Sequence, residues 1–206
     1  MNRLNLSAIR PLCRCEINQA ATVLSHGMCR NPANVRAFGA ADPERRRRAL
    51  EQFFLPVLRG LYDRGVILGA FCENTLVGVC GMARPGCCQP PMREKLLVFP
   101  AVAFRTPLGA PLRIFRWSRA WARHDPSEAH WHLGPVAVAP HLQGKGIGGA
   151  MLAEFCARMD ACCMLSYLET DKPENIAFYQ KFGFAVIGQA QVLGVPNWFM
   201  SRQVGF

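Results

Sequence analysis

Short apolar runs bounded by glycine, proline or polar residues recur along this chain and predict β-strands. Two of them, 66–72 and 76–82, are separated by three residues, which is the spacing of an antiparallel hairpin. A third run, 130–138, contains Gly134-Pro135, where glycine permits a distortion and proline removes a ladder donor, so we expect a bulge there. Further strands are expected at 5–12, 164–170, 184–188 and 192–200.

Amphipathic segments between these runs predict helices. Residues 16–38 are expected to be helical but broken at Asn31-Pro32, because the residue before a proline is pushed out of the helical region. A longer helix is expected from Pro43 to Asp63, and Pro56 should kink it or divide it in two. A short helix over 173–182 should end at Gly183. Another begins near residue 147, where apolar residues recur every four positions: Ile147, Met151, Phe155 and Met159.

The segment 85–127 fits neither pattern, because proline recurs along it while 113–121 looks helical. We expect an insertion of loops and one or two helices, which is a type of segment that often forms a lid. With 206 residues, of which 50% are hydrophobic, the chain can bury one sizeable core. We therefore expect a single domain over residues 1–206.

The chain carries a formal net charge of +10, which would attract polyanions at low salt. Part of this charge is the run Arg45 to Arg48, which is typical of a solvated helix face, and no nucleic-acid-binding motif accompanies it. The first 25 residues hold no uninterrupted apolar run, so neither a signal peptide nor a membrane span is predicted. We expect a cytoplasmic protein with no nucleic-acid and no membrane partner.

Ten cysteines raise the question of disulfides or zinc. The pairs Cys87-Cys88 and Cys162-Cys163 are vicinal, and no C-x-x-C spacing occurs in the sequence. Structural zinc sites usually show that spacing, so we expect no metal. Free cysteine often behaves as a small buried hydrophobe, and reduced thiols are the expectation here.

The stretch from Val136 to Gly149 joins a buried-strand pattern to a glycine-rich loop and then to an amphipathic helix. Its glycines let the backbone approach a ligand closely, because they lack a Cβ atom. The first N–H groups of the helix are unpaired, and with the helix dipole they favour a phosphate anion. The stretch therefore predicts a phosphate-binding loop around Gly144, Gly146, Gly148 and Gly149.

Two phosphate ligands, ATP and a dinucleotide, fit the sequence of this loop poorly. The P-loop of ATPases is excluded, because Lys145 is followed by Gly146 and not by serine or threonine. A dinucleotide fingerprint is satisfied by Gly144, Gly146 and Gly149, with Glu169 twenty positions further on. However, four residues separate the strand from the first glycine, and only 57 residues follow the last one, too few for a doubly wound dinucleotide domain.

Coenzyme A is the third ligand, and here the chain resembles the GNAT acyltransferase superfamily. Residues Gln143 to Gly148 match its Q/R-x-x-G-x-G/A signature, and the family also places a strand like 136–138 before it. Downstream, the acidic Glu169 at a strand end, Asn175, and the F-Y-x-x-x-G-F pattern of 178–184 match the second family signature. The resemblance extends over about 130–200 and includes the hairpin at 66–82.

The resemblance implies an α/β (α+β) fold with a central mixed, mostly antiparallel sheet of six to seven strands. This sheet splays at its central parallel pair, is flanked by helices, and carries the insertion at about 85–127; the core that binds acetyl-CoA spans about 66–200. Acetyl-CoA is implied as the co-substrate. The residues that the resemblance implies for binding it are Val136, Ala137, Val138, Gln143, Gly144, Lys145, Gly146, Ile147, Gly148, Gly149, Asn175 and Tyr179.

Acyl transfer from a thioester needs a neutral nucleophile, donors to the oxyanion and an acid for the leaving thiolate. The family motif points to Tyr179 as that acid. An amine acceptor must also lose a proton, for which His132 on the cofactor-side strand is the first candidate. Glu169 at the end of the next strand is the second candidate, and a chain of waters is the third.

The acceptor is expected to enter opposite the cofactor, near the insertion. Four tryptophans are candidates to line its pocket or to pack in the core, namely Trp117, Trp121, Trp131 and Trp198. We expect an N-acetyltransferase acting directly on a primary amine of a small molecule, as a monomer or homodimer. The alternatives are a protein amine as acceptor, or a GNAT module that binds acyl-CoA without catalysis.

Overall fold

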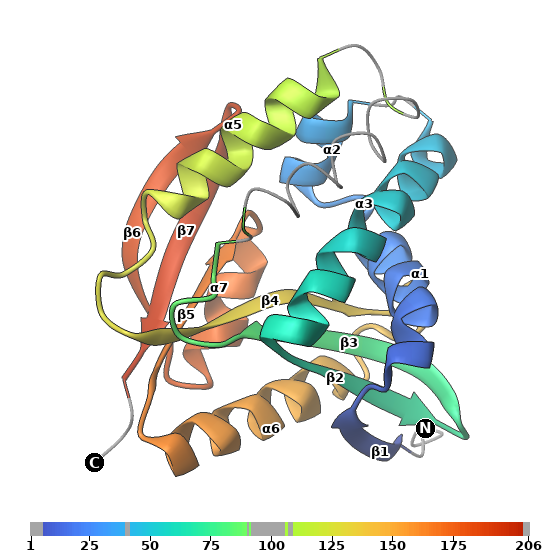
Figure 1. The fold of residues 1–206 in the computed structure, drawn as a ribbon, viewed down its shortest axis with the longest axis vertical. Helices are drawn as coiled ribbons and strands as arrows, with labels where there is room; N and C mark the ends of the chain where they lie inside the picture. Colours follow the sequence, from blue (N-terminus) through green and yellow to red (C-terminus); the bar gives the residue numbers. More distant parts are fainter. Residues whose placement is uncertain (1–5, 40–41, 90, 92–105, 107–108, 204–206) are drawn as a thin grey trace.

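A computed structural model describes residues 6–39, 42–89, 91, 106 and 109–203. Within these residues, seven strands form one mixed sheet in the order β1-β2-β3-β4-β5-β7-β6 (Figure 1). Its strands are β1 (Leu6–Pro11), β2 (Gly65–Cys72), β3 (Thr75–Ala83), β4 (His130–Val138), β5 (Leu165–Thr170), β6 (Ala185–Val192) and β7 (Val195–Arg202). The expected mixed sheet flanked by helices is confirmed.

The helices begin and end close to the positions that the sequence predicts. Asn31 is extended before Pro32, so the early helical segment is broken there as expected. The described helices are α1 (Ile17–Met28), α2 (Pro32–Phe38), α3 (Pro43–Arg64), α5 (Ala110–Ala122), α6 (Ile147–Cys162) and α7 (Pro173–Gln180). Much of the predicted 85–127 insertion lies outside the described residues, but α5 is the helix expected within it.

Strands β4 and β5 are the parallel pair of the sheet, and they stay paired over a short distance. Their register joins His130 to Leu165 and ends at His132 opposite Tyr167, although both strands continue and are fully described. Next to this point, Leu133 pairs with Met82 and Val136 with Cys80, so two residues of β4 lie opposite one residue of β3, and the bulge expected at Gly134-Pro135 is confirmed. The sheet therefore splays at its central parallel pair.

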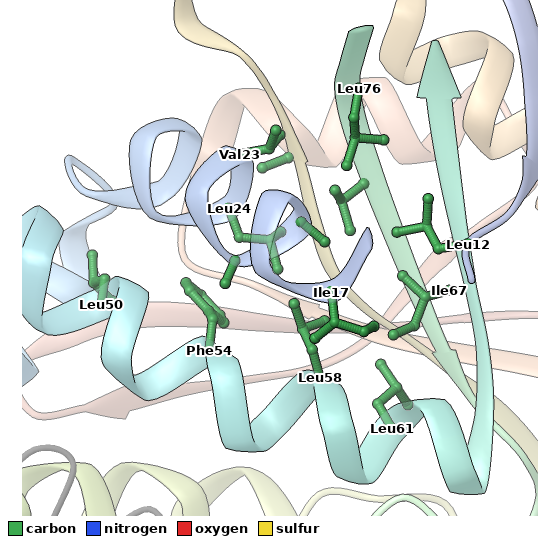
Figure 2. Close-up of a cluster of buried hydrophobic side chains, with 14 of the residues drawn as sticks. Leu12, Ile17, Val23, Leu24, Leu50, Phe54, Leu58, Leu61, Ile67 and Leu76 are labelled. Carbon is green, nitrogen blue, oxygen red and sulfur yellow. The ribbon is translucent and has the colours of Figure 1, made fainter. Parts of the chain in front are cut away.

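Helices cover both faces of this sheet, and each face has its own hydrophobic core. On one face, α1 and α3 pack against β2 and β3 around Leu24, Phe54 and Leu58 (Figure 2). On the other face, α6 packs its predicted stripe, in which Met151 and Phe155 are fully buried. The alternation of side chains along the strands supplies both cores, since Ile67 faces one and Leu68 the other.

Two expectations concern helix α3. Pro56 lies inside a helix that runs without a break from Pro43 to Arg64, so of the two expected effects, a kink or a division, it does not cause a division. The run Arg45 to Arg48 is also not a uniformly solvated face, because Arg46 is buried and its Nε donates to the carbonyl of Cys29 at 2.6 Å. That prediction was wrong for Arg46, because a charge run shows nothing of a carbonyl on another helix.

The cysteines are not all reduced as expected. Cys13 and Cys15 form a disulfide at the turn between β1 and α1, with their Cα atoms 5.4 Å apart. The expectation of reduced thiols is wrong for this pair, because the tight turn brings the two side chains together. The other described cysteines are free.

Helix α5 crosses from α2 to the far strands and forms one wall of the molecule (Figure 1). Its Arg113 donates from Nε to the carbonyl of Ala37 in α2 at 2.9 Å. At its other end, Trp121 donates from Nε1 to Oδ1 of the buried Asn197 in β7 at 2.9 Å. The described helices include none long and apolar enough to cross a membrane.

We predict that Gly27→Ala destabilises the protein, because α1 packs closely on β4. A Cβ atom at Gly27 would lie 2.7 Å from Ala137 Cβ and 2.9 Å from the carbonyl oxygen of Val138. Overpacking of this kind costs about 1–3 kcal/mol, so the melting temperature should fall by about 2–12 °C in a thermal denaturation experiment. The control is Gly149→Ala in α6, where the nearest atom is 3.7 Å away. An equal change in both variants would contradict the prediction.

Candidate active site

The glycine loop connects β4 to α6 in the geometry of an anion site. Gly144 and Gly146 have φ angles of 74° and 87°, which are in the left-handed region that favours glycine. The first helical hydrogen bond runs from Ala150 N–H to the carbonyl of Gly146, so the preceding N–H groups of α6 have no intrahelical partner. The loop is exposed, and its backbone donors are available to a phosphate.

The side chain of Gln143 connects this loop to the end of β4 by a hydrogen bond. Its Nε2 donates to the carbonyl of Val138 at 3.0 Å, which ties the loop back to the end of β4. The four-residue lead-in contains a turn of 3-10 helix over Pro140–Leu142, in which Leu142 is buried. Lys145 is exposed on the loop, where it adds positive charge.

The residues expected along the cofactor are on the part of β4 beyond its pairing with β5. Val136, Ala137 and Val138 pair with β3 on one side. On the other side, the described register with β5 has already ended at His132. The splay therefore leaves an open strand edge, which is the kind of surface that binds an extended chain by backbone hydrogen bonds.

A cavity of about 380 Å³ opens at this splay, and it brings together side chains that are far apart in the sequence. Its wall includes His132 of β4, Glu169 of β5, and Asn175 and Tyr179 of α7. The opposite wall is largely apolar and contains residues from α3 and α5. Its volume lies within the range of small-molecule sites, which is about 300–1,000 Å³.

Two of the four candidate tryptophans, Trp117 and Trp121 of α5, line the cavity, where their rings meet edge to face at 4.8 Å. Among the described residues, Trp131 instead packs against the core beneath α6. Trp198 is in β7 and is not part of the described lining.

His132 and Glu169 form a direct pair at the point where the strands separate. His132 Nε2 lies 2.8 Å from Glu169 Oε2, and both side chains are largely buried. A carboxylate only accepts hydrogen bonds, so Nε2–H is the donor. Burial opposes a charge on His132, but Glu169, Cys88 and Asp125 outweigh it and hold the His132 pKa well above its usual value.

Tyr179 of α7 is buried, and its ring contacts those of Phe178 and Phe184 edge to face. Burial, with Cys80 and Asp171 nearby, raises the pKa of its phenol, so it remains protonated at neutral pH. Asn175, one turn earlier, donates from Nδ2 to Thr170 Oγ1 at 3.1 Å. This bond joins α7 to the end of β5.

Three polar side chains beside this pair were not predicted from the sequence. Cys88 Sγ lies 3.3 Å from His130 Nε2, and Asp125 Oδ1 lies 3.8 Å from His132 Nδ1. Burial disfavours the Cys88 thiolate, but hydrogen bonds from His130 and His132 lower its pKa to about 7. The sequence His130-Trp-His132 could have indicated that His130 lies beside His132, because alternate residues of a strand point to the same face of the sheet.

Comparison with known proteins agrees with this geometry. Residues 114–186 match the family model described as "Acetyltransferase (GNAT) domain". The fold is similar to a solved structure from Corynebacterium glutamicum, described as histone acetyltransferase HPA2 and related acetyltransferase. That similarity has a TM-score of 0.73 and 22% identity, and it covers 97% of each chain.

Two further solved structures carry cofactors. A GNAT family acetyltransferase from Brucella melitensis, in complex with acetyl-CoA, matches with a TM-score of 0.53 and 16% identity, over 97% of this chain and 88% of that one. The PaiA N-acetyltransferase from Thermoplasma acidophilum, in complex with coenzyme A, matches with a TM-score of 0.58 and 15% identity, over 95% and 98%.

The motifs, the splayed sheet and the family model agree with one another. The resemblance found in the sequence is confirmed, because residues 114–186 match the model of the GNAT acetyltransferase domain and the sheet has the mixed topology that the resemblance implies.

Proposed function

We propose that this protein is an N-acetyltransferase that transfers an acetyl group from acetyl-CoA directly to the primary amine of a small molecule. The observation that carries this proposal is the cavity at the splay of β4 and β5, which is lined by His132, Glu169 and Tyr179. A proton acceptor and a proton donor thus face the place where the open strand edge would hold a thioester.

Acetyl-CoA would bind along the splay with its pyrophosphate at the glycine loop. The free N–H groups at the start of α6 and the exposed Lys145 suit that anion. The pantetheine arm would run beside Val136 to Val138 as an added strand, and Asn175 would contact it from the opposite side. Bound acetyl-CoA or coenzyme A in two neighbours of the same fold supports this ligand.

The amine must lose a proton as its nitrogen attacks the thioester carbonyl. We assign Glu169 as the group that accepts this proton, because its Oε1 is buried with no hydrogen-bond partner among the described residues. Glu169 Oε2 accepts the hydrogen bond from His132 Nε2, so the imidazole holds the carboxylate in place. In this division Glu169 is the proton acceptor and His132 is the positioning residue, since the imidazole already donates to it.

Tyr179 supplies the proton at the other end of the reaction. As the carbon–sulfur bond breaks, the thiolate of coenzyme A needs a proton or a strong hydrogen-bond donor. The buried phenol keeps its proton at neutral pH and lines the same cavity as Glu169. The products are then the acetylated amine and coenzyme A as the free thiol.

The opposite wall of the cavity favours a small acceptor with an apolar part. Phe53, Ile114 and Trp117 contribute apolar surface there. Two buried polar atoms in the lining have no partner among the described residues, namely Asn31 Oδ1 and Trp117 Nε1. An amine that also carries a hydrogen-bond acceptor would satisfy both atoms.

An acceptor screen tests the proposal, with release of coenzyme A thiol as the readout. The panel would hold small primary amines with aromatic or aliphatic groups, polyamines, histone-tail peptides and peptides with a free N-terminus. Thiol release that depends on a small amine supports the proposal. Turnover on the peptides alone would identify a protein acceptor, and tight acetyl-CoA binding without turnover on any acceptor would indicate a non-catalytic module.

We predict that Tyr179→Phe lowers kcat by at least about tenfold, because the phenol proton is lost while the ring still packs. Steady-state kinetics with the best acceptor and thermal denaturation measure the two effects, and the melting temperature should change little. The matched control is Tyr62→Phe in α3, which removes a phenol outside the cavity. Unchanged turnover in Tyr179→Phe would remove this role.

We predict that Glu169→Gln lowers kcat by about 10²–10⁴-fold and leaves the KM for acetyl-CoA nearly unchanged, because it removes a proton acceptor and not a cofactor contact. The amide keeps the shape of the carboxylate, so folding should be retained. The control is Glu154→Gln in α6, whose carboxylate pairs with Arg158 away from the cavity. A raised KM with unaltered kcat would assign Glu169 to binding instead.

A further inference from the structure

The two ends of the connection between β3 and β4 lie close to each other, beside the start of β4. Cys88 lies shortly after the end of β3, and Asp125 lies shortly before the start of β4. Both side chains meet His130 and His132, which project from the same face of β4. Cys88, His130 and His132 each place one ligand atom within 4.8 Å of the other two, and Asp125, His132 and Glu169 form a second group of the same kind, so His132 belongs to both.

Two of these side chains carry buried atoms whose hydrogen-bonding capacity is not used within the described residues. They are His132 Nδ1 and Asp125 Oδ1, which lie 3.8 Å apart. Their remaining polar atoms are held, since His132 Nε2 donates to Glu169 at 2.8 Å and Asp125 Oδ2 accepts from Gln89 at 2.6 Å. Buried polar atoms are rarely left without a partner, so this arrangement points to a missing ligand.

His130 is oriented in the same manner. Its Nδ1 lies 2.8 Å from the backbone carbonyl of Glu128, to which it donates, so in the neutral imidazole Nε2 carries the lone pair that a metal ion could bind. That nitrogen lies 3.3 Å from Cys88 Sγ. Histidines that bind metals usually donate their other ring N–H to a carbonyl or a carboxylate, and His130 and His132 show one case of each.

We propose that Cys88 Sγ, His130 Nε2 and His132 Nδ1 bind a zinc ion, and that Asp125, which lies beside His132, turns its Oδ1 toward the ion as the fourth ligand. Ligand atoms on a tetrahedral zinc ion lie about 3.3–3.6 Å apart, given bonds of about 2.0–2.3 Å. Cys88 Sγ lies 3.3 Å from His130 Nε2, which is within this range, and Asp125 Oδ1 lies 3.8 Å from His132 Nδ1, slightly beyond it. A set of one sulfur, two imidazole nitrogens and one carboxylate suits zinc and is unsuited to magnesium or calcium, which prefer oxygen ligands.

The charges of this site also balance. A thiolate and a carboxylate offset the two positive charges of the ion, while both imidazoles bind as neutral ligands. The ion would fasten both ends of the 84–129 connection to β4, beside the cavity that His132 and Glu169 line. It would thus fix the wall on which the acceptor binds, and His132 would have one nitrogen on the metal and one on Glu169.

Zinc binding to the full chain tests this site. The protein is loaded with ZnCl₂, dialysed against metal-free buffer, and analysed for metal per chain by inductively coupled plasma mass spectrometry. We expect about one zinc ion per chain, and loading with Co²⁺ should give the absorption of a tetrahedral thiolate complex. Competition with a chromophoric chelator should show affinities lowered roughly tenfold or more in Cys88→Ser and in Asp125→Asn.

The matched control is Cys87→Ser, which removes the neighbouring thiol and should bind zinc like the wild type. Circular dichroism and acetyl-CoA binding establish that each variant is folded, and two ligand variants are used so that one misfolded protein does not decide the result. Wild-type protein without retained zinc, or equal affinity in the wild type and both ligand variants, would overturn the proposal. Acetylation of Cys88 by acetyl-CoA in metal-loaded protein, seen by mass spectrometry, would also overturn it.

Discussion

The short parallel pairing between β4 and β5 is the constraint on which the rest of the site depends. Backbone bonds hold His132 opposite Tyr167, and beyond that point the two strands separate while the Gly134-Pro135 bulge redirects β4 against β3. A parallel pair that continued would use up both strand edges and close the sheet. Because it stops, one edge of β4 is free for an extended ligand, and a cavity forms between β5, α7 and the helices above it.

The same separation explains why ionisable side chains gather at the splay. Polar groups are costly to bury without partners, and most buried side chains of the described sheet are apolar on both faces. Where the pairing of the two strands ends, His132, Glu169 and Tyr167 lie against one another. Burial, with Glu169, Asp125 and Cys88 nearby, raises the pKa of Tyr167, whose hydroxyl has no partner among the described residues. The site therefore concentrates polar groups in a low-dielectric setting, where each interaction is stronger than in water.

Local patterns were enough to predict most of the fold, and the exceptions depend on distant contacts. The β4 bulge follows from the two residues that form it. In contrast, Pro56 removes one helical bond, but the buried positions Leu50, Phe54 and Leu58 continue through it on one face, and this packing keeps α3 whole. The burial of Arg46 depends on a carbonyl at the end of α1 that no charge pattern reveals.

The residues of the candidate site also fall into those that local patterns predict and those that depend on distant contacts. His132, Glu169 and Tyr179 could be named from motif and strand position, whereas Cys88 and Asp125 reach β4 only through the path of the 84–129 connection. The two groups meet at one imidazole. With Nδ1 on a metal ion, His132 would be neutral and its single proton would be fixed on Nε2, directed at Glu169. The ring could then neither accept a proton nor exchange tautomers, which leaves Glu169 as the group that receives the proton of the amine.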